Sequence, residues 1–170
     1  MNDTGAKIMK SLIVYFSWTG CVAKLAEHLR TQLVPLGEVV MMRIVPVREH
    51  GYWGWLMRSF LPGWSVPIHP VVADFGDYDV VCLGFPKWTL SCPPVNRYIR
   101  DIPLHPRSRI GLFMSCGGFD QERYMKSMVN RLALRGARVV AVTSIRRNAI
   151  SDGRFKKEID HFCRRLCAHT

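Results

Sequence analysis

The amino-acid sequence predicts an α/β fold: a three-layer sandwich built on a five-stranded parallel sheet. Short apolar runs rich in β-branched residues alternate along the chain with amphipathic stretches of helical spacing. The chain of 170 residues is long enough for one domain with a substantial core. Alternating strands and helices favour parallel pairing through right-handed crossovers, with helices on both faces of the sheet.

The first elements are a strand, a helix and a second strand. Residues 11–16 (SLIVYF) form a continuous apolar run, as expected of a strand buried on both faces. Between residues 20 and 33 the apolar residues recur at the spacing of an amphipathic helix, which ends before Gly37. Residues 38–44 (EVVMMRI) then predict the second strand.

The second half of the chain repeats this alternation. Three more strand-like runs lie at residues 78–85, 109–115 and 138–144. Helical patterns follow each of them, beginning at Pro93–Pro94 and spanning residues 121–134 and 153–166.

Five such strands favour the spatial order 2-1-3-4-5, in which ligands bind beyond the carboxyl ends of the strands. The loops to inspect are therefore residues 17–21, 86–92 and 116–120. One segment does not fit the alternation, and it is rich in Trp, Pro and His. We therefore expect residues 1–170 to form one domain with an aromatic-rich insertion at about residues 45–75.

The net charge of +11 is concentrated in the second half of the chain. Residues 1–96 hold eight basic and seven acidic side chains, whereas residues 97–170 hold 16 and six. A basic half could attract nucleic acid, anionic lipid or an acidic protein partner. The alternative is an arginine-rich solvated surface.

The N-terminal residues and the shortness of the apolar runs favour a cytoplasmic location. The first ten residues do not resemble a secretory signal, and no apolar run approaches the length of a membrane span. The six cysteines are therefore expected to be reduced, and their spacing includes no CxxC pair. A structural metal is not expected.

The loop after the first predicted strand has the features of an anion site. It reads SWTGCV over residues 17–22, with two hydroxyls, a glycine and the free N–H groups of a helix start. A single phosphate suits it better than a pyrophosphate, because no GxGxxG motif is present. The alternative is that Ser17 and Thr19 are ordinary helix caps.

The next two loops offer a flat aromatic surface and a close backbone approach. Trp88 follows the third strand, where a planar ring could stack on its indole. Gly117 and Gly118 follow the fourth strand and would let a ligand edge approach the backbone. The alternatives are a tryptophan buried against the next helix and a bare turn.

These motifs resemble the flavodoxins and the NAD(P)H-dependent flavin reductases of flavodoxin-like fold. The matching stretches are LIVYFSWTG, YDVVCLGFPKWTLSCPPV and IGLFMSCGGF, in the family's order, and the resemblance covers nearly the whole chain. It implies an FMN cofactor whose phosphate is bound by Ser17, Trp18, Thr19, Gly20, Cys21 and Val22. It also implies that the flavin ring lies between two sets of residues: Pro86, Lys87, Trp88, Thr89 and Leu90 on one side, and Cys116, Gly117, Gly118 and Phe119 on the other.

The phosphate loop departs from the family pattern at Cys21 and Val22, where Asn-Thr is usual. Losing a hydroxyl bond to a charged phosphate is expected to cost about 1.5–3 kcal/mol, or roughly one to two decades of affinity. The loops also carry Cys21, Cys92 and Cys116. These thiols could be redox-active beside a flavin, or could simply fill tight space.

The resemblance implies flavin-dependent redox chemistry: electron transfer, or reduction of a small acceptor such as a quinone. No Ser-His-Asp or paired-carboxylate arrangement is visible, so no catalytic side chain is expected and the chemistry would belong to FMN. The strongly basic chain favours a higher flavin potential than that of an acidic flavodoxin. The alternative is a flavodoxin-fold binding module with weak or no FMN, whose basic C-terminal half holds an acidic partner.

The insertion predicts a short helix that ends before Pro62. The helical spacing predicts that Met57 and Phe60 face the sheet, while Trp53 or Trp55 lines the mouth of the ring site or a homodimer contact. The alternative is that this helix is simply the crossover that follows the second strand.

Overall fold

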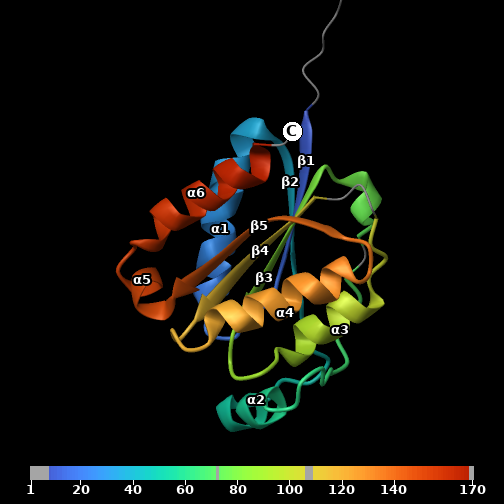
Figure 1. Ribbon diagram of the computed structural model, residues 1–170, viewed down its shortest axis with the longest axis vertical. Coiled ribbons are helices and arrows are strands. Elements are labelled where there is room, and N and C mark those ends of the chain that lie inside the picture. The colour runs from blue at the N-terminus through green and yellow to red at the C-terminus, as the bar shows by residue number, and fades with distance from the viewer. Residues whose placement is uncertain (1–7, 72, 106–108, 169–170) are drawn as a thin grey trace, which may run out of the picture.

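The computed structural model describes residues 8–71, 73–105 and 109–168. Its five strands are parallel and form one sheet in the order β2-β1-β3-β4-β5, which confirms the predicted topology (Figure 1). The strands are β1 (Met9–Tyr15), β2 (Gly37–Arg43), β3 (Val80–Pro86), β4 (Arg109–Cys116) and β5 (Arg138–Arg146).

The burial of each strand follows from its place in the sheet. β3 and β4 are buried along their whole length, and five of the seven residues of β1 are buried. These central strands are the continuous apolar runs of the sequence, as expected for strands covered on both faces. The two edge strands, β2 and β5, are only partly buried.

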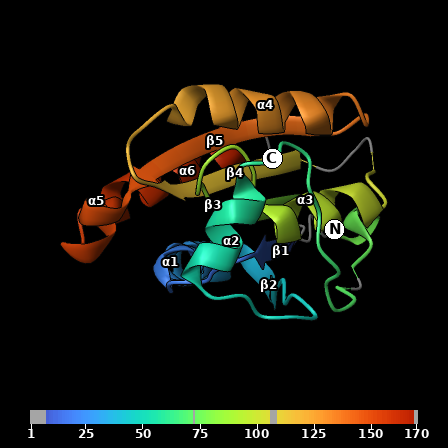
Figure 2. The ribbon, with the colours of Figure 1, turned by 90° about the horizontal axis from the view of Figure 1, so that it is seen from below.

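Helices cover both faces of the sheet (Figures 1 and 2). α1 (Cys21–Leu33) and α6 (Phe155–Cys167) pack on one face with Ile13, Val80 and Phe113. α3 (Pro93–Asp101) and α4 (Gln121–Ala133) pack on the other. A short helix, α5 (Arg147–Ser151), precedes α6 and was not predicted. None of the described helices is long and apolar enough to cross a membrane.

The insertion helix α2 (Tyr52–Ser59) does not cover a face of the sheet. It lies beyond the carboxyl ends of the strands, at the bottom of Figure 1 and in front of the sheet in Figure 2. The prediction that Met57 and Phe60 face the sheet is wrong, because these side chains are 64% and 49% exposed. The inward residues are Trp55 and Ser59. α2 is therefore a cap over the sheet's end, and not a crossover helix.

Hydrogen bonds join this cap to the loop that follows β3. The Ser59 carbonyl accepts from the Leu90 N–H at 3.0 Å, and the Ser59 and Thr89 hydroxyls are 2.7 Å apart. Farther along, the Ser91 hydroxyl donates to the Leu61 carbonyl at 3.0 Å. The insertion and the loop after β3 therefore form one structural unit.

Candidate functional site

The loop between β1 and α1 has the geometry of an anion site. Gly20 ends the loop with a φ of 83°, the left-handed region that favours glycine. Within the described part of the chain, the backbone N–H groups of residues 18–22 have no hydrogen-bond acceptor. Unpaired amides at the start of a 13-residue helix favour a negatively charged ligand.

The two hydroxyls of this loop have different surroundings. Ser17 is buried, and its Oγ accepts a hydrogen bond from the Ala23 N–H at 3.2 Å, as a helix cap does. The same hydroxyl can still donate its proton to an anion. Thr19 is exposed. The Arg43 guanidinium donates to the Ser17 carbonyl at 3.0 Å and places one cation beside the loop.

Position 22 contributes to the core and offers no hydroxyl. The Val22 side chain is 1% exposed and belongs to the apolar cluster between the sheet and the α1 and α6 helices. Cys21 is half-buried against the edge of that cluster. At these two positions the chain thus offers an anion only backbone amides and a thiol.

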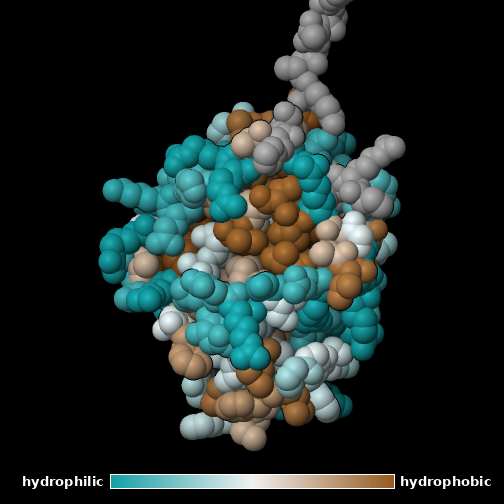
Figure 3. All heavy atoms as spheres, in the orientation of Figure 1, coloured by the Kyte–Doolittle hydropathy of each residue, from teal (hydrophilic) through white to brown (hydrophobic). Residues whose placement is uncertain are grey.

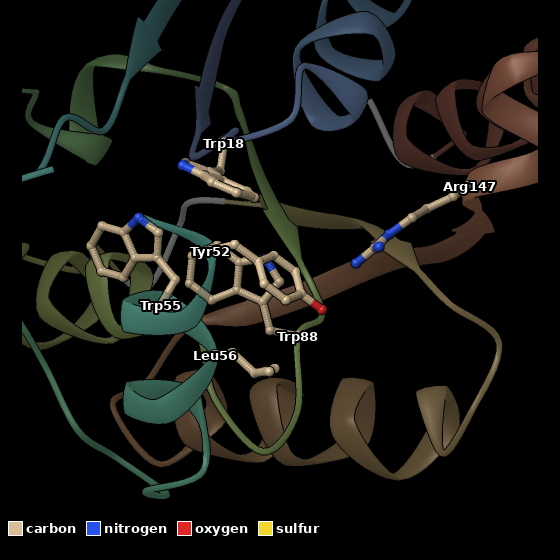
Figure 4. Close-up of a pocket in the computed structure, with 6 residues that line it drawn as sticks. All are labelled: Trp18, Tyr52, Trp55, Leu56, Trp88 and Arg147. Carbon is tan, nitrogen blue, oxygen red and sulfur yellow. The ribbon is translucent and has the colours of Figure 1, made fainter. Parts of the chain in front are cut away.

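An aromatic cavity adjoins the phosphate loop (Figure 4). It encloses about 320 Å³ of empty space, part of it open to solvent, and is lined by Trp18, Tyr52, Trp55, Leu56, Trp88 and Arg147. Trp55 is buried and lines this cavity, whereas Trp53 is exposed and lines neither this cavity nor the one beyond Trp88. That Trp53 or Trp55 lines the mouth of the ring site or a homodimer contact therefore stays a prediction. Arg147 was not predicted as a site residue. It follows β5 directly, and that place at the carboxyl edge of the sheet is the signal that could have identified it.

Trp88 is the central side chain of the site, and it is half-buried. Its indole stacks at a tilt of 32° on that of Trp55, with ring centroids 5.4 Å apart, and meets the edge of Phe16 at 5.6 Å. One side of the indole thus packs against other aromatic side chains, while the residue also lines two cavities. Whether a planar ring stacks on Trp88 stays a prediction.

A second and wider cavity opens on the other side of Trp88. The loop after β3 supplies one wall, the loop after β4 supplies the opposite wall, and the residue after α2 closes one end. Its lining residues are Phe60, Lys87, Trp88, Thr89, Leu90, Gly117, Phe119 and Asp120, around about 730 Å³ of empty space that includes open solvent. We call this cavity the ring slot. It brings together the two loops that the sequence predicted to face each other.

Lys87 places a positive charge at the ring slot. The residue is only 8% exposed, and its backbone N–H donates to the Ser115 carbonyl at 2.8 Å. The ammonium group has no acceptor among the described residues and lies 5.9 Å from the centroid of the Phe119 ring, a cation–π contact. Because Lys87 lines a cavity that is open to solvent, its positive charge is available to a ligand that carries negative charge.

Not every predicted site residue lines the slot. Pro86 and Cys116 are buried strand ends, and Cys116 donates a hydrogen bond to Gln121 Oε1 at 3.0 Å. Gly118 adopts a φ of 100° and packs against Arg146. The loop backbone at Gly117 is open, because a Cβ built there would meet no atom within 4 Å.

None of the three loop cysteines is among the residues that line the two cavities. Cys92 is fully buried, and burial raises the pKa of its thiol. Burial also raises the pKa of Cys116, against the opposing effect of Arg146 and Lys87. These surroundings favour space-filling thiols at both positions. Among the described residues, no group of three or more His, Cys, Asp or Glu side chains is arranged to hold a metal ion.

One known protein is similar to this chain in sequence, and many solved structures are similar to it in fold. No protein-family model matches the chain. An uncharacterized protein of Archaeoglobus fulgidus is 34% identical over 113 residues, which span 66% of this chain and 69% of that protein. At this identity and coverage, the two chains belong to one family.

Solved structures of similar shape confirm the flavodoxin-like fold. Oxidised flavodoxin 2 of Bacillus cereus covers 95% of this chain and 99% of its own, with a TM-score of 0.67 and 19% identity. A flavoprotein of Lactobacillus acidophilus in complex with FMN covers 85% and 97%, with a TM-score of 0.65 and 16% identity. A candidate flavoprotein of Bacteroides eggerthii covers 90% and 97%, with a TM-score of 0.67 and 21% identity.

Proposed function

We propose that this chain is an FMN-dependent redox protein, with the phosphate in the loop after β1 and the flavin ring in the ring slot. The observation that carries the proposal is that the five amides at residues 18–22, which have no acceptor among the described residues, adjoin a slot walled by aromatic side chains and the Lys87 ammonium. The flavodoxin and the FMN-bound flavoprotein among the similar structures support it.

The phosphate would be held mainly by the backbone. The amides of residues 18–22 and the hydroxyls of Ser17 and Thr19 are the donors that the loop offers. Arg43 adds positive charge beside the loop, and Arg147 adds it at the adjoining aromatic cavity. These cations offset part of the binding energy lost with the missing hydroxyl at position 22.

The ring would lie between the Lys87–Leu90 and Gly117–Asp120 segments. FMN, when bound, transfers electrons singly or as a pair, while the protein sets its position and potential. Trp88 and Phe119 supply apolar contact area, and Lys87 stabilises negative charge on the ring. This site therefore favours a higher reduction potential for bound FMN than an acidic site of the same shape would.

The slot is also open enough for a small acceptor to reach the ring. Leu90 and Phe119 are 53% and 83% exposed, and the backbone at Gly117 has free space beside it. We infer reduction of a small planar acceptor such as a quinone in preference to electron transfer to a protein partner. In either case the redox partner meets the ring at this mouth.

The proposal is tested by titrating the purified protein with FMN. We expect a yellow protein whose bound flavin shows a perturbed visible absorption band and quenched fluorescence. Gly20→Ala should weaken FMN binding, because its φ of 83° holds the amides in place. Gly136→Ala is the matched control, since Gly136 has the same φ, equal free space and no place in the site. Protein that stays colourless with added FMN would contradict the proposal.

A further inference from the structure

Six large apolar side chains stand exposed at one end of the molecule, on α2 and the turn that follows it. We call them the α2 face: Tyr52, Trp53, Met57, Phe60, Leu61 and Trp64, each between 48% and 73% exposed. In Figure 3, brown and tan spheres gather at the lower tip of the molecule, where Figure 1 places α2. An apolar surface of this kind on a monomer marks an interaction site.

The fold itself does not require these side chains. α2 is anchored from its other side, by buried Trp55 and by Ser59, whose hydroxyl and carbonyl bind the loop after β3. A helix this rich in large apolar side chains is normally covered on more than one side. Here the described residues cover only the side of Trp55 and Ser59, which leaves the α2 face open to a partner.

The charge around the α2 face favours an anionic partner. Residues 43–73 contain Arg43, Arg48 and Arg58 but a single carboxylate, Glu49, and the chain carries a net charge of +11. Arg147 adds a cation to the cavity beside Tyr52 and Leu56. Within this segment a carboxylate that would repel an anionic surface is thus scarce, and in the adjoining ring slot the one carboxylate among the lining residues, Asp120, is matched by Lys87.

The shape and composition of the α2 face select among anionic partners. The face protrudes beyond the sheet (Figures 1 and 3) and mixes indole, phenol and long aliphatic side chains. Arg58 lies on the same helix, and Arg147 lines the cavity beside Tyr52. Tryptophan and tyrosine favour the interfacial zone of a bilayer, and arginines beside them favour anionic headgroups. We propose that the α2 face docks the protein reversibly on an anionic lipid surface.

Docking would bring the ring slot to the same surface. Phe60 belongs both to the α2 face and to the slot lining, and exposed Leu90 and Phe119 continue the apolar surface to the slot mouth. A lipid-soluble acceptor could then pass from the bilayer to the slot. This last step rests on the proposed function, whereas the docking itself rests on the α2 face alone.

Cosedimentation with lipid vesicles tests the docking. The full chain is mixed with vesicles of phosphatidylcholine, or of phosphatidylcholine and phosphatidylglycerol in equal parts. We expect binding to the mixed vesicles that falls when salt is raised. Trp53→Ser and, separately, Leu61→Ser should each weaken it by about tenfold, the order expected for one large side chain leaving an apolar contact.

The controls separate docking from folding and from flavin binding. Leu134→Ser removes a side chain that is 88% exposed, and it should leave vesicle binding unchanged. Leu134 follows α4, which runs from the carboxyl edge of the sheet to the amino edge, so it lies at the opposite end from α2. Trp53 and Leu61 line neither cavity, so FMN affinity should stay at the wild-type value in both variants.

Several outcomes would overturn the docking. They are no binding to mixed vesicles, equal affinity for both vesicle types, or equal loss of binding in Leu134→Ser. A wild-type dimer that becomes monomeric in Trp53→Ser would assign the α2 face to a second copy of the chain, and would overturn it too. Binding to vesicles without binding of FMN would contradict only the proposed function. Binding of FMN without binding to vesicles would contradict only the docking.

Discussion

The indoles of Trp55 and Trp88 stack 5.4 Å apart and join the insertion helix to the loop after β3. Trp55 is 1% exposed, whereas Trp88 lines both cavities of the site. The insertion therefore supports the wall against which a flavin ring would lie. A substitution at Trp55 should therefore change both the free energy of unfolding and the affinity for FMN.

Trp55→Ala tests this coupling. The substitution should lower the free energy of unfolding by about 3–5 kcal/mol, the range for deleting a large buried aromatic side chain. It should also weaken FMN binding, because Trp88 loses its packing partner. Trp53→Ala is the control: that indole is 73% exposed, and its removal should change stability by no more than about 0.5 kcal/mol. Denaturant unfolding and FMN titration measure both quantities, and intact FMN affinity in Trp55→Ala would contradict the coupling.

Lys87→Met should lower the reduction potential of bound FMN. Removing the ammonium takes away a positive charge that favours the negatively charged, reduced ring. The expected change is tens of millivolts, corresponding to about 1–2 kcal/mol between charges across a partly shielded site. Lys126→Met, at an exposed position of α4, is the control and should leave the potential unchanged. An unchanged potential in Lys87→Met would mean that the ring lies elsewhere.

The sheet and its helices could be predicted because their signals are local. Strands that are covered on both faces appear in the sequence as apolar runs, as in β1, β3 and β4. Helices that pack one face on the sheet show apolar residues at helical spacing, as in α1, α4 and α6. The site loops could be placed because the carboxyl ends of parallel strands lie at one edge. Whether Ser17, Trp88 or Gly117 contacts a ligand remains a prediction.

The orientation of α2 could not be predicted in the same way. Large apolar residues occur around most of the helix, so spacing alone suggested a stripe through Met57 and Phe60. The inward residues are instead Trp55 and the polar Ser59. What decides the orientation is non-local: Ser59 binds Thr89 and Leu90, thirty residues along the chain. For Arg147 the sequence signal was only its place directly after the last strand, and its position beside Trp18 and Tyr52 comes from the fold.

Val22→Thr should strengthen FMN binding. Threonine has nearly the shape of valine, and a hydroxyl in the first turn of α1 can donate to the phosphate, a bond of about 1.5–3 kcal/mol to a charged group. Part of this gain is offset by placing a hydroxyl in the core, so we expect about tenfold higher affinity. Val80→Thr is the control, because Val80 lies in the same apolar cluster at the amino end of β3. Equal or weaker FMN binding by Val22→Thr would show that position 22 does not reach the phosphate.

Cys167 should react as a thiolate near neutral pH. The Cys163 thiol, one helical turn earlier on α6, hydrogen-bonds to the Cys167 sulfur and, with Arg109 nearby, lowers the pKa of Cys167 to about 7. The same bond, together with burial, raises the pKa of Cys163. Because the thiolate is the nucleophile, alkylation of Cys167 should accelerate as the pH rises through 7 and then level off. Iodoacetamide labelling followed by peptide mass spectrometry measures this rate.

Two comparisons decide whether the hydrogen bond is the cause. In Cys163→Ala the inflection of the Cys167 rate should move upward, toward the pKa of an ordinary thiol, since the bond that stabilises the thiolate is lost. Cys82 is fully buried in β3, and burial raises the pKa of its thiol. It should therefore stay unmodified in the folded wild-type protein and in folded Cys163→Ala. An inflection for Cys167 that is the same with and without the Cys163 thiol would mean that Arg109 alone sets its ionisation.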